Sequence, residues 1–232
     1  MAGLGSIWQT AAMSQPFVLG VDLDGVCADH VRGFRTVVAA ERGVDPETLP
    51  LNRSWGFEEW GLDDAEFERL HELAVVEHRM LRDLEPIKGA ADVLWRLSDA
   101  GVWIRIITHR LYVNWGHGIA AGDTAAWLDD VRIPYRDLCF LGAKADVGAD
   151  MYVEDAPHNI EALRASGRDV IVFDQPYNRQ LAAPRAIDWN QVEDYVAQAL
   201  ARRGDGVQSQ LPGIDAGAQR LDRRLRADRS AE

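Results

Sequence analysis

Hydrophobic and polar positions along the chain follow two alternating patterns. Short apolar runs rich in β-branched residues are typical of buried parallel strands, and stretches with apolar residues at helical spacing separate them. The predicted strands are residues 17–24, 102–108, 138–142, 151–155 and 169–174, and the predicted helices are residues 89–101, 123–131, 157–167 and 189–203. This alternation predicts an α/β fold, a doubly wound and mainly parallel sheet with its site at the carboxyl ends of the strands.

The interval between Gly25 and Pro86 is too long for a simple crossover. It contains two helical stretches, residues 30–43 and 63–85, on either side of the aromatic segment 53–61. We therefore predict a small helical cap inserted after the first strand. The predicted division of the chain is a core of residues 16–26 and 87–203 and a cap of residues 27–86.

Both ends of the chain lack the apolar periodicity of a packed element. Residues 1–15 are predicted to be flexible, and translation from Met1 or from Met13 fits the sequence. Residues 204–232, first rich in glycine and then densely charged, are predicted to be disordered. The sequence shows no secretory signal and no apolar run long enough to span a membrane, so we expect a cytoplasmic protein with no membrane partner.

The charge of the chain argues against one class of partner. The formal net charge is −12, and it lies entirely within residues 1–203, which hold 32 acidic against 20 basic residues. Binding to nucleic acid needs clustered cations, so no nucleic acid partner is expected. Only Lys88 and Lys144 are lysines, which makes a lysine at a chemically required position an informative signal.

The first predicted strand ends in two carboxylates, Asp22 and Asp24, which strand periodicity places on the same side of the chain. Such a pair could bind a divalent cation, or could divide into a nucleophile and a general acid and base. An acidic turn without chemistry is the alternative, because Asp-Gly is a common turn pair.

Three further strands end in residues suited to phosphate chemistry. Thr108 ends the second strand with a hydroxyl, Lys144 follows the third, and Glu154 and Asp155 close the fourth as adjacent carboxylates. Taken singly, Thr108 could be an ordinary strand residue and Asp155 a helix cap before Pro157. Signals at four successive strand ends are a much stronger indication than any one of them.

The segments DLDGV, IITHR, the loop around Lys144 and VEDAP resemble, in this order, the four motifs of the haloacid dehalogenase superfamily, over residues 17–173. The resemblance implies a Rossmann-like core and a phosphatase in which Asp22 attacks phosphorus and forms an aspartyl-phosphate. Asp24 would be the general acid and base, a role that dehalogenase members do without. Thr108 and Lys144 would stabilise the charge of the transferred phosphoryl group.

The same resemblance implies magnesium as the cofactor. The ion would be bound by the Asp22 carboxylate, the Asp24 backbone carbonyl and Asp155, with water and phosphate completing an octahedron of oxygen ligands. Glu154 would orient a bound water rather than touch the metal itself.

A narrower resemblance links the chain to the cytosolic type C 5′-nucleotidases, which include the 5′(3′)-deoxyribonucleotidases. It rests on DLDGVCAD, WGFEEWG, VEDAPHN and FDQPYNR and on the helical cap. Two motifs depart from that family. His109 and Arg110 stand near the place where its members carry a small residue and a proline, and Glu154 stands where they have an aspartate. These departures bear on the nucleotide preference and leave the phosphatase chemistry intact.

The cap is expected to choose the substrate. Its aromatic residues either stack on a base or sugar or form the core of the cap, and the two residues after Thr108 either contact the substrate or are exposed loop residues. The predicted substrate-binding residues are Phe34, Trp55, Phe57, His109 and Arg110, with Trp60 as a further aromatic candidate. The segment Tyr177-Asn178-Arg179 resembles the closing segment of the family and has no assigned role.

The function implied is a magnesium-dependent phosphomonoesterase for a small-molecule phosphate ester, first of all a (deoxy)ribonucleoside monophosphate. Two alternatives stay open: a phosphatase for another ester such as a sugar phosphate, and a catalytically silent protein of this fold that binds a ligand or partner. Silent members usually lack the nucleophile or the acid and base, whereas this chain has both Asp22 and Asp24. The sequence carries no signal for an oligomeric state.

Overall fold

The computed structural model describes residues 15–111 and 115–204. The predictions of a flexible segment at residues 1–15 and of a disordered tail at residues 204–232 therefore lie, except for Gln15 and Gly204, outside the described residues. Within the described residues, no helix is long and apolar enough to cross a membrane.

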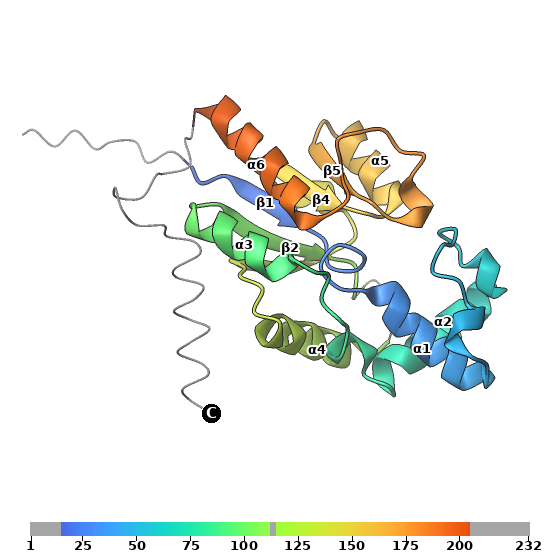
Figure 1. Ribbon diagram of the computed structural model, residues 1–232. Helices are drawn as coiled ribbons and strands as arrows, with labels where there is room; N and C mark the ends of the chain where they lie inside the picture. The colour runs from blue at the N-terminus through green and yellow to red at the C-terminus, as the bar shows by residue number, and fades with distance from the viewer. Residues whose placement is uncertain (1–14, 112–114, 205–232) are drawn as a thin grey trace, which may run out of the picture.

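The described residues form one six-stranded sheet in which every pairing is parallel (Figure 1). Its strands, in spatial order, are β3 (Asp137–Phe140), β2 (Trp103–Thr108), β1 (Val18–Val21), β4 (Met151–Glu154), β5 (Asp169–Phe173) and β6 (Arg185–Ala186). The predicted α/β class and parallel sheet are confirmed. The sixth strand was not predicted, because two residues are too short to show a strand pattern.

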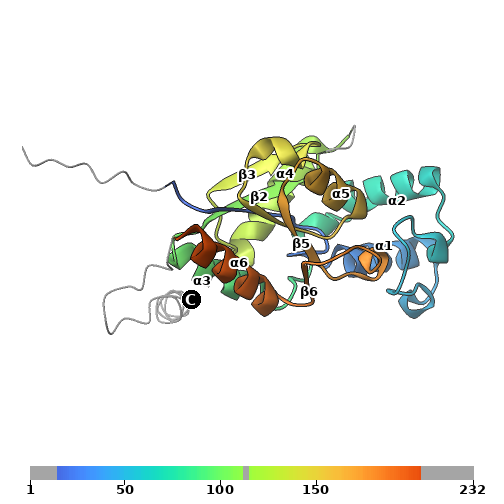
Figure 2. The same cartoon turned by 90° about the horizontal axis from the view of Figure 1, so that it is seen from above.

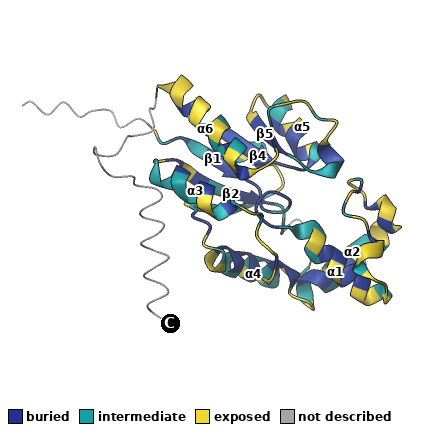
Figure 3. Cartoon of the chain, in the orientation of Figure 1, coloured by how far each residue is buried: buried dark blue, intermediate teal, exposed yellow. Residues whose placement is uncertain are grey.

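Helices cover both faces of the sheet. Apolar side chains of α3 (Ala90–Asp99), α4 (His117–Asp130) and α6 (Trp189–Arg203) share one core cluster with strand residues such as Val21 and Ile106. A second cluster on the opposite face joins α5 (Pro157–Ala165) to strand residues such as Tyr152. Figure 2 shows α3 and α6 on one side of the sheet and α5 on the other. Burial is concentrated in the strands and the inward faces of these helices (Figure 3).

One predicted helix begins earlier than expected. The predicted helix covers residues 123–131, but α4 begins at His117. Gly118 and Gly122 weaken the helical signal in the sequence. Burial of Ala120 and of the α4 residue Trp127 against the core offsets that low propensity.

The segment between β1 and α3 contains helices that lie beyond the carboxyl ends of the strands (Figure 1). Its elements are α1 (His30–Arg42), η1 (Pro46–Thr48), η2 (Glu58–Trp60), α2 (Asp64–Val76) and η3 (Met80–Arg82). We call residues 27–86 the cap, following the predicted boundaries. The aromatic rings of Phe34, Phe57 and Phe67 lie within 5.5 Å of one another and form much of its interior.

The pattern of residues 63–85 predicts a single helix, but the structure divides this stretch. Helix α2 ends at Val76, and Arg79 adopts a left-handed conformation with a φ of 52° before η3. The Arg79 guanidinium donates two hydrogen bonds to Asp123 of α4, of which the one from Nε is 2.7 Å long, and the Asp123 side chain is 3% exposed. This contact of Arg79 with a buried carboxylate of the core favours the break, and local periodicity does not reveal it.

The chain enters and leaves the cap through two paired segments. Asp29 N donates to Glu85 O at 2.9 Å, and Ile87 N donates to Cys27 O at 2.7 Å. Pairing of the two connections holds the cap at the same edge of the sheet as the strand ends.

Candidate active site

The carboxyl ends of four neighbouring strands meet at one cavity of about 440 Å³. Asp22 follows β1, Thr108 ends β2, Lys144 begins η4 (Lys144–Val147) after β3, and Asp155 follows β4. All four residues line the cavity. It lies beside β1 and β4, where the strand order reverses, which is the usual position of a ligand crevice in an open α/β sheet.

Lys144 is a buried cation at the cavity floor. Its ammonium donates to Asp22 Oδ1 at 2.7 Å and to Glu154 Oε2 at 2.6 Å, and the side chain is 3% exposed. Burial alone lowers the pKa of an ammonium, but the two carboxylates outweigh it and raise the pKa of Lys144. Lys144 therefore remains charged and can attract phosphoryl oxygens.

Glu154 is a buried carboxylate that binds Lys144 and the start of the segment after β4. One carboxylate oxygen accepts the Lys144 hydrogen bond, and the other accepts hydrogen bonds from Ala156 N at 3.1 Å and from Asn159 Nδ2 at 3.4 Å. The residue is 1% exposed. Both oxygens thus have protein partners, which suits the supporting role expected for Glu154.

Three buried carboxylates form an acidic cluster: Asp22, Glu154 and Asp155 each place an oxygen within 4.8 Å of the others. Burial raises the pKa of Asp22 to about 7, with a further contribution from Glu154 that Lys144 opposes. Burial and the Asp22 charge also raise the pKa of Asp155 well above its usual range. Three carboxylates against one ammonium leave an excess of negative charge, so this hard-oxygen donor set fits a divalent cation.

Asp24 pairs with Arg110 and does not join this cluster. Arg110 Nη2 lies 2.6 Å from Asp24 Oδ1 and Arg110 Nε lies 3.0 Å from Oδ2, while Nη1 donates to Thr124 Oγ1 at 3.1 Å. Burial alone raises the pKa of Asp24, but the Arg110 guanidinium, together with His30 and His71, lowers it to about 2. Because the Arg110 side chain is 2% exposed, the alternative of an exposed loop residue is wrong. Each guanidinium nitrogen already has a protein partner.

Thr108 and His109 also face the cavity. Thr108 is 1% exposed, and its Oγ1 accepts a hydrogen bond from Arg110 N at 3.3 Å. His109 Nε2 lies 2.9 Å from Gly142 O, which ties the loop after β2 to the loop after β3. Burial lowers the pKa of His109, so the neutral ring donates this hydrogen bond.

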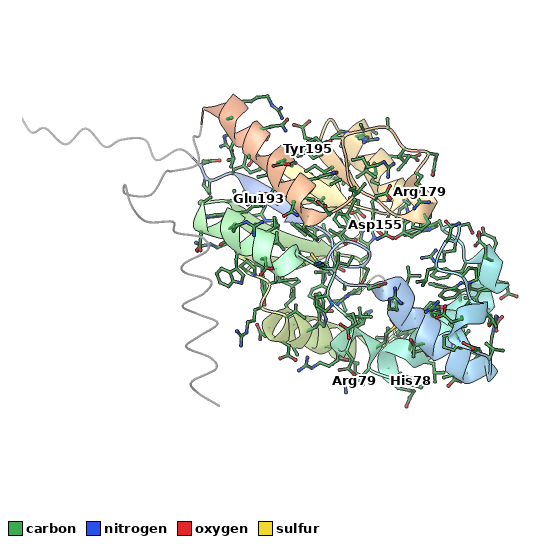
Figure 4. All side chains as sticks on the ribbon, viewed as in Figure 1. His78, Arg79, Asp155, Arg179, Glu193 and Tyr195 are labelled. Atoms are coloured by element: carbon green, nitrogen blue, oxygen red, sulfur yellow. The ribbon has the colours of Figure 1, made fainter. Side chains whose placement is uncertain are left out.

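The structure gives contacts to the segment that had no predicted role. The Tyr177 hydroxyl donates to Asp155 Oδ2, and Asn178 Nδ2 donates to Asp155 O and Phe173 O, each at 2.8 Å. Arg179, in contrast, has a side chain that is 62% exposed. Figure 4 shows Asp155 between the sheet and the cap, with Arg179 farther out.

The cap supplies the wall opposite the acidic cluster. Among its predicted aromatic residues, Trp55 and Phe57 line the cavity, whereas Phe34 and Trp60 do not. Trp55 is 46% exposed, and Phe34 is completely buried in the interior of the cap. The geometry thus makes Trp55 and Phe57 the direct candidates for substrate contact and Phe34 a support behind Phe57.

Sequence reasoning did not single out three basic cap residues that also line the cavity: Arg53, His30 and His71. His30 Nε2 and His71 Nε2 lie 3.4 Å apart, and burial lowers the pKa of both rings. Their positions in the sequence could have indicated a place at the site, because His30 directly follows DLDGVCAD and Arg53 begins the aromatic segment.

Solved structures of other proteins share this fold. A haloacid dehalogenase-like hydrolase from Streptococcus pneumoniae superposes with a TM-score of 0.54 at 15% identity, over 78% of this chain and 98% of that one. Another from Xanthomonas campestris gives a TM-score of 0.53 at 14% identity, over 82% of this chain and 99% of that one. The fold is that of the haloacid dehalogenase-like hydrolases.

Sequence relatives narrow the assignment. The family described as 5′ nucleotidase, deoxy (pyrimidine), cytosolic type C protein matches residues 16–202, and the chain belongs to this family. A protein of Chlorobaculum tepidum, provisionally named a 5′(3′)-deoxyribonucleotidase, is 41% identical over 199 residues, which cover 83% of this chain and 98% of the relative. A protein of Bordetella pertussis with the same provisional name is 28% identical over 189 residues, 78% of this chain and 96% of the relative. Both predicted resemblances are confirmed, and with them the class of phosphoric monoester hydrolases.

Proposed function

We propose that this protein is a magnesium-dependent 5′-nucleotidase that hydrolyses (deoxy)ribonucleoside monophosphates through an aspartyl-phosphate on Asp22. The observation that carries the proposal is the position of Asp22, beside Lys144 and within a buried acidic cluster, at the floor of a cavity walled by aromatic cap residues. Membership of the type C nucleotidase family supports the substrate class. The cavity volume of about 440 Å³ suits a small-molecule ligand.

Asp22 is the proposed nucleophile. Its carboxylate attacks phosphorus in line with the leaving oxygen, the ester bond breaks, and the phosphoryl group passes to the carboxylate oxygen. Lys144 holds Asp22 at 2.7 Å and, with the Thr108 hydroxyl, stabilises charge on the phosphoryl oxygens. A magnesium ion held by Asp22, the Asp24 carbonyl and Asp155 would offset the phosphoryl charge and admit a dianion to this acidic site.

Asp24 is the proposed general acid and base. Arg110 holds the pKa of Asp24 low in the free protein, and the negative charge of a bound phosphate ester would raise it, so that Asp24 can protonate the leaving alkoxide as the acid. As the base it then takes a proton from the water that hydrolyses the aspartyl-phosphate. The Arg110 contact keeps the Asp24 carboxylate in one orientation at the cavity, where 28% of its side chain is exposed.

The cap wall is the proposed recognition surface for the base or sugar. Trp55 offers an exposed apolar face for stacking, and Phe57 adds apolar surface beneath the Arg53 guanidinium. The half-buried His30 and His71 offer ring nitrogens nearby. This combination of apolar and polar surface favours a nucleoside over a sugar phosphate, whose ring offers mainly hydroxyl groups. We expect the protein to act in the cytoplasm on free nucleotides.

A panel of phosphate esters tests the proposal. Purified protein is assayed for phosphate release from deoxyribonucleotides, ribonucleotides, glucose 6-phosphate and p-nitrophenyl phosphate, with magnesium or with EDTA. We expect nucleotides to give the highest kcat/KM and EDTA to abolish release. If sugar phosphates are the best substrates, the sugar phosphatase alternative replaces the nucleotidase. If the protein binds nucleotides but hydrolyses no ester, the silent alternative replaces both.

Asp22→Asn tests the nucleophile within the same assay. This change keeps the shape of the side chain and removes its charge, so turnover should fall by roughly 10³-fold or more. Asp129→Asn, at an exposed position of α4, is the matched control and should be fully active. Acid-quenched protein should carry covalent phosphate in the wild type and not in D22N. Near-normal turnover of folded D22N would refute the assignment.

A further inference from the structure

Tyr177 joins three parts of the molecule at the edge of the cavity. It lies in η5 (Pro176–Asn178), after β5, and is 8% exposed. Its hydroxyl donates to Asp155 Oδ2 on the core side. Its ring meets the cap on the other side, through Trp55, whose ring centroid is 5.2 Å away at an interplanar angle of 73°.

A cap arginine packs on the same ring. The Arg53 guanidinium carbon lies 4.8 Å from the centre of the Tyr177 ring and 3.5 Å from that of Phe57, which places the cation between two aromatic faces. Arg53 is 6% exposed. The Tyr177 ring is therefore a seat for the cap segment 53–57, built from one edge-on aromatic contact and one cation–π contact.

Several hydrogen bonds hold the core side of this seat in place. Asn178 donates to Asp155 O and to Phe173 O, and Arg185 Nη1 donates to Asn178 Oδ1 at 2.8 Å. Gln175 Nε2, from the residue before η5, donates to Gly25 O at 2.7 Å. These bonds hold η5 against both the strand end and the loop after β1.

Gly25 makes the close approach of Tyr177 and Asp155 possible. It has a φ of 82°, and a Cβ at this position would lie 2.0 Å from Asp155 Oδ2 and 2.9 Å from the Tyr177 hydroxyl. No other residue type fits without displacing one of the two groups. The loop after Asp22 thus leaves room for a hydrogen bond that none of the proposed catalytic steps uses.

We propose that Tyr177 is a positioning residue that couples the seating of the cap to the orientation of the metal ligand Asp155. The hydroxyl fixes Oδ2 of Asp155 and with it the orientation of this carboxylate in the acidic cluster. Packing of segment 53–57 on the Tyr177 ring holds the ring where its hydroxyl can donate to Asp155. The inference rests on the proposed metal site but not on the identity of the ester that is hydrolysed.

Hydrogen-bonding partners behind a metal ligand typically change metal affinity by about 10- to 100-fold when they are removed. Tyr177→Phe removes the hydroxyl and keeps the ring, so the affinity for a divalent cation should fall by about that factor. Trp55→Ala removes a cap contact without a change of charge and should weaken binding by about 3- to 10-fold. In the Y177F background, W55A should have no further effect, because the link between the ring and Asp155 is already broken.

The test is a direct titration with Mn²⁺ as a spectroscopic substitute for Mg²⁺. Electron paramagnetic resonance measures the concentration of free Mn²⁺ at each step and so gives the dissociation constant. It is made on the full chain, as wild type, Y177F, W55A and the double variant. Tyr195→Phe, on α6 and far from Asp155 in Figure 4, and Trp103→Ala, at a half-exposed position of β2, are matched controls that should bind like the wild type. Thermal unfolding verifies that each variant is folded.

Three outcomes decide the inference. Weaker Mn²⁺ binding by Y177F and W55A, with no additivity in the double variant, supports the coupling. Wild-type affinity in folded Y177F overturns the role of the hydroxyl, and independent, multiplicative effects overturn the link to the cap. In turnover assays, Y177F should raise the magnesium concentration needed for half-activation and regain activity at saturating magnesium. A protein that binds Mn²⁺ as expected but hydrolyses no nucleotide would contradict the proposed function and leave this inference standing.

Discussion

Arg110 offers the sharpest test of how the site works, because it lines the cavity and its guanidinium is bound to Asp24. Arg110→Met keeps an unbranched apolar stem and removes all three contacts with the Asp24 carboxylate, which are 2.6, 3.0 and 3.2 Å long. Arg110→Lys keeps the positive charge but loses the bidentate contact with the Asp24 carboxylate. The pair of variants separates the effect of charge from the effect of orientation.

The cost in stability follows from burial. Breaking a fully buried ion pair typically costs about 3–5 kcal/mol. Here the Arg110 side chain is 2% exposed but the Asp24 side chain is 28% exposed, so water can solvate the released carboxylate. We therefore expect R110M to lose about 1–3 kcal/mol in the free energy of unfolding, measured by denaturant titration.

The effect on catalysis should depend on the leaving group. A nucleoside alkoxide is a poor leaving group and needs the proton from Asp24, and general acid catalysis contributes about 10²- to 10⁴-fold. A p-nitrophenolate ion leaves readily without a proton. If Arg110 orients Asp24, R110M should reduce kcat/KM for a deoxyribonucleotide about 10- to 100-fold more than for p-nitrophenyl phosphate. R110K should fall between R110M and the wild type.

The assay compares kcat/KM for the two esters at saturating magnesium. This constant reports the first chemical step, in which the leaving group departs, and not the later hydrolysis of the aspartyl-phosphate. An equal loss for both esters would refute the positioning role and return Arg110 to the originally predicted contact with substrate. Unchanged kcat/KM for both esters would show that the ion pair is only structural.

Three other predictions follow from the site and the sequence. Because the pKa values of Asp22 and Asp155 are raised, the folded protein without metal binds more protons than the unfolded chain. Its melting temperature in EDTA should therefore fall as the pH rises from about 4 through 7, and magnesium should restore it. A melting temperature that depends on neither pH nor magnesium would contradict the acidic cluster. Trp55→Ala or Phe57→Ala, at saturating magnesium, should reduce kcat/KM for nucleotides more than for p-nitrophenyl phosphate, and equal losses would make these residues only cap core. Removal of residues 1–12 and 205–232, which keeps the left-handed C-cap Gly204 of α6, should leave melting temperature and turnover nearly unchanged; a large loss of either would reveal a packed segment at an end of the chain.

The residues at the strand ends could be predicted from the sequence because parallel strands present their carboxyl ends at one edge of a sheet. Asp22, Thr108, Lys144 and Asp155 each follow or end a short apolar run, and the order of these runs is visible along the chain. Strand type and order therefore sufficed to predict that the four side chains converge, as they do around the cavity. The parallel sheet was predictable on the same ground.

Contacts across long sequence separations were decided only by the tertiary structure. Arg110 meets Asp24 across 86 positions, and Tyr177 meets Asp155 from a turn whose residues show no periodicity. The bend at Arg79, within a stretch that looks helical, depends on a buried carboxylate in α4.

The physical reason is the range over which each kind of information acts. Periodicity determines which face of an element is apolar and what residues stand at its ends. The partner of a polar side chain depends on how loops and helices from distant parts of the chain pack. Trp55 and Phe34 are equal aromatic candidates in the sequence, yet Trp55 faces the cavity and Phe34 is completely buried. The packing of α1 against the segment after it places the two side chains at different depths.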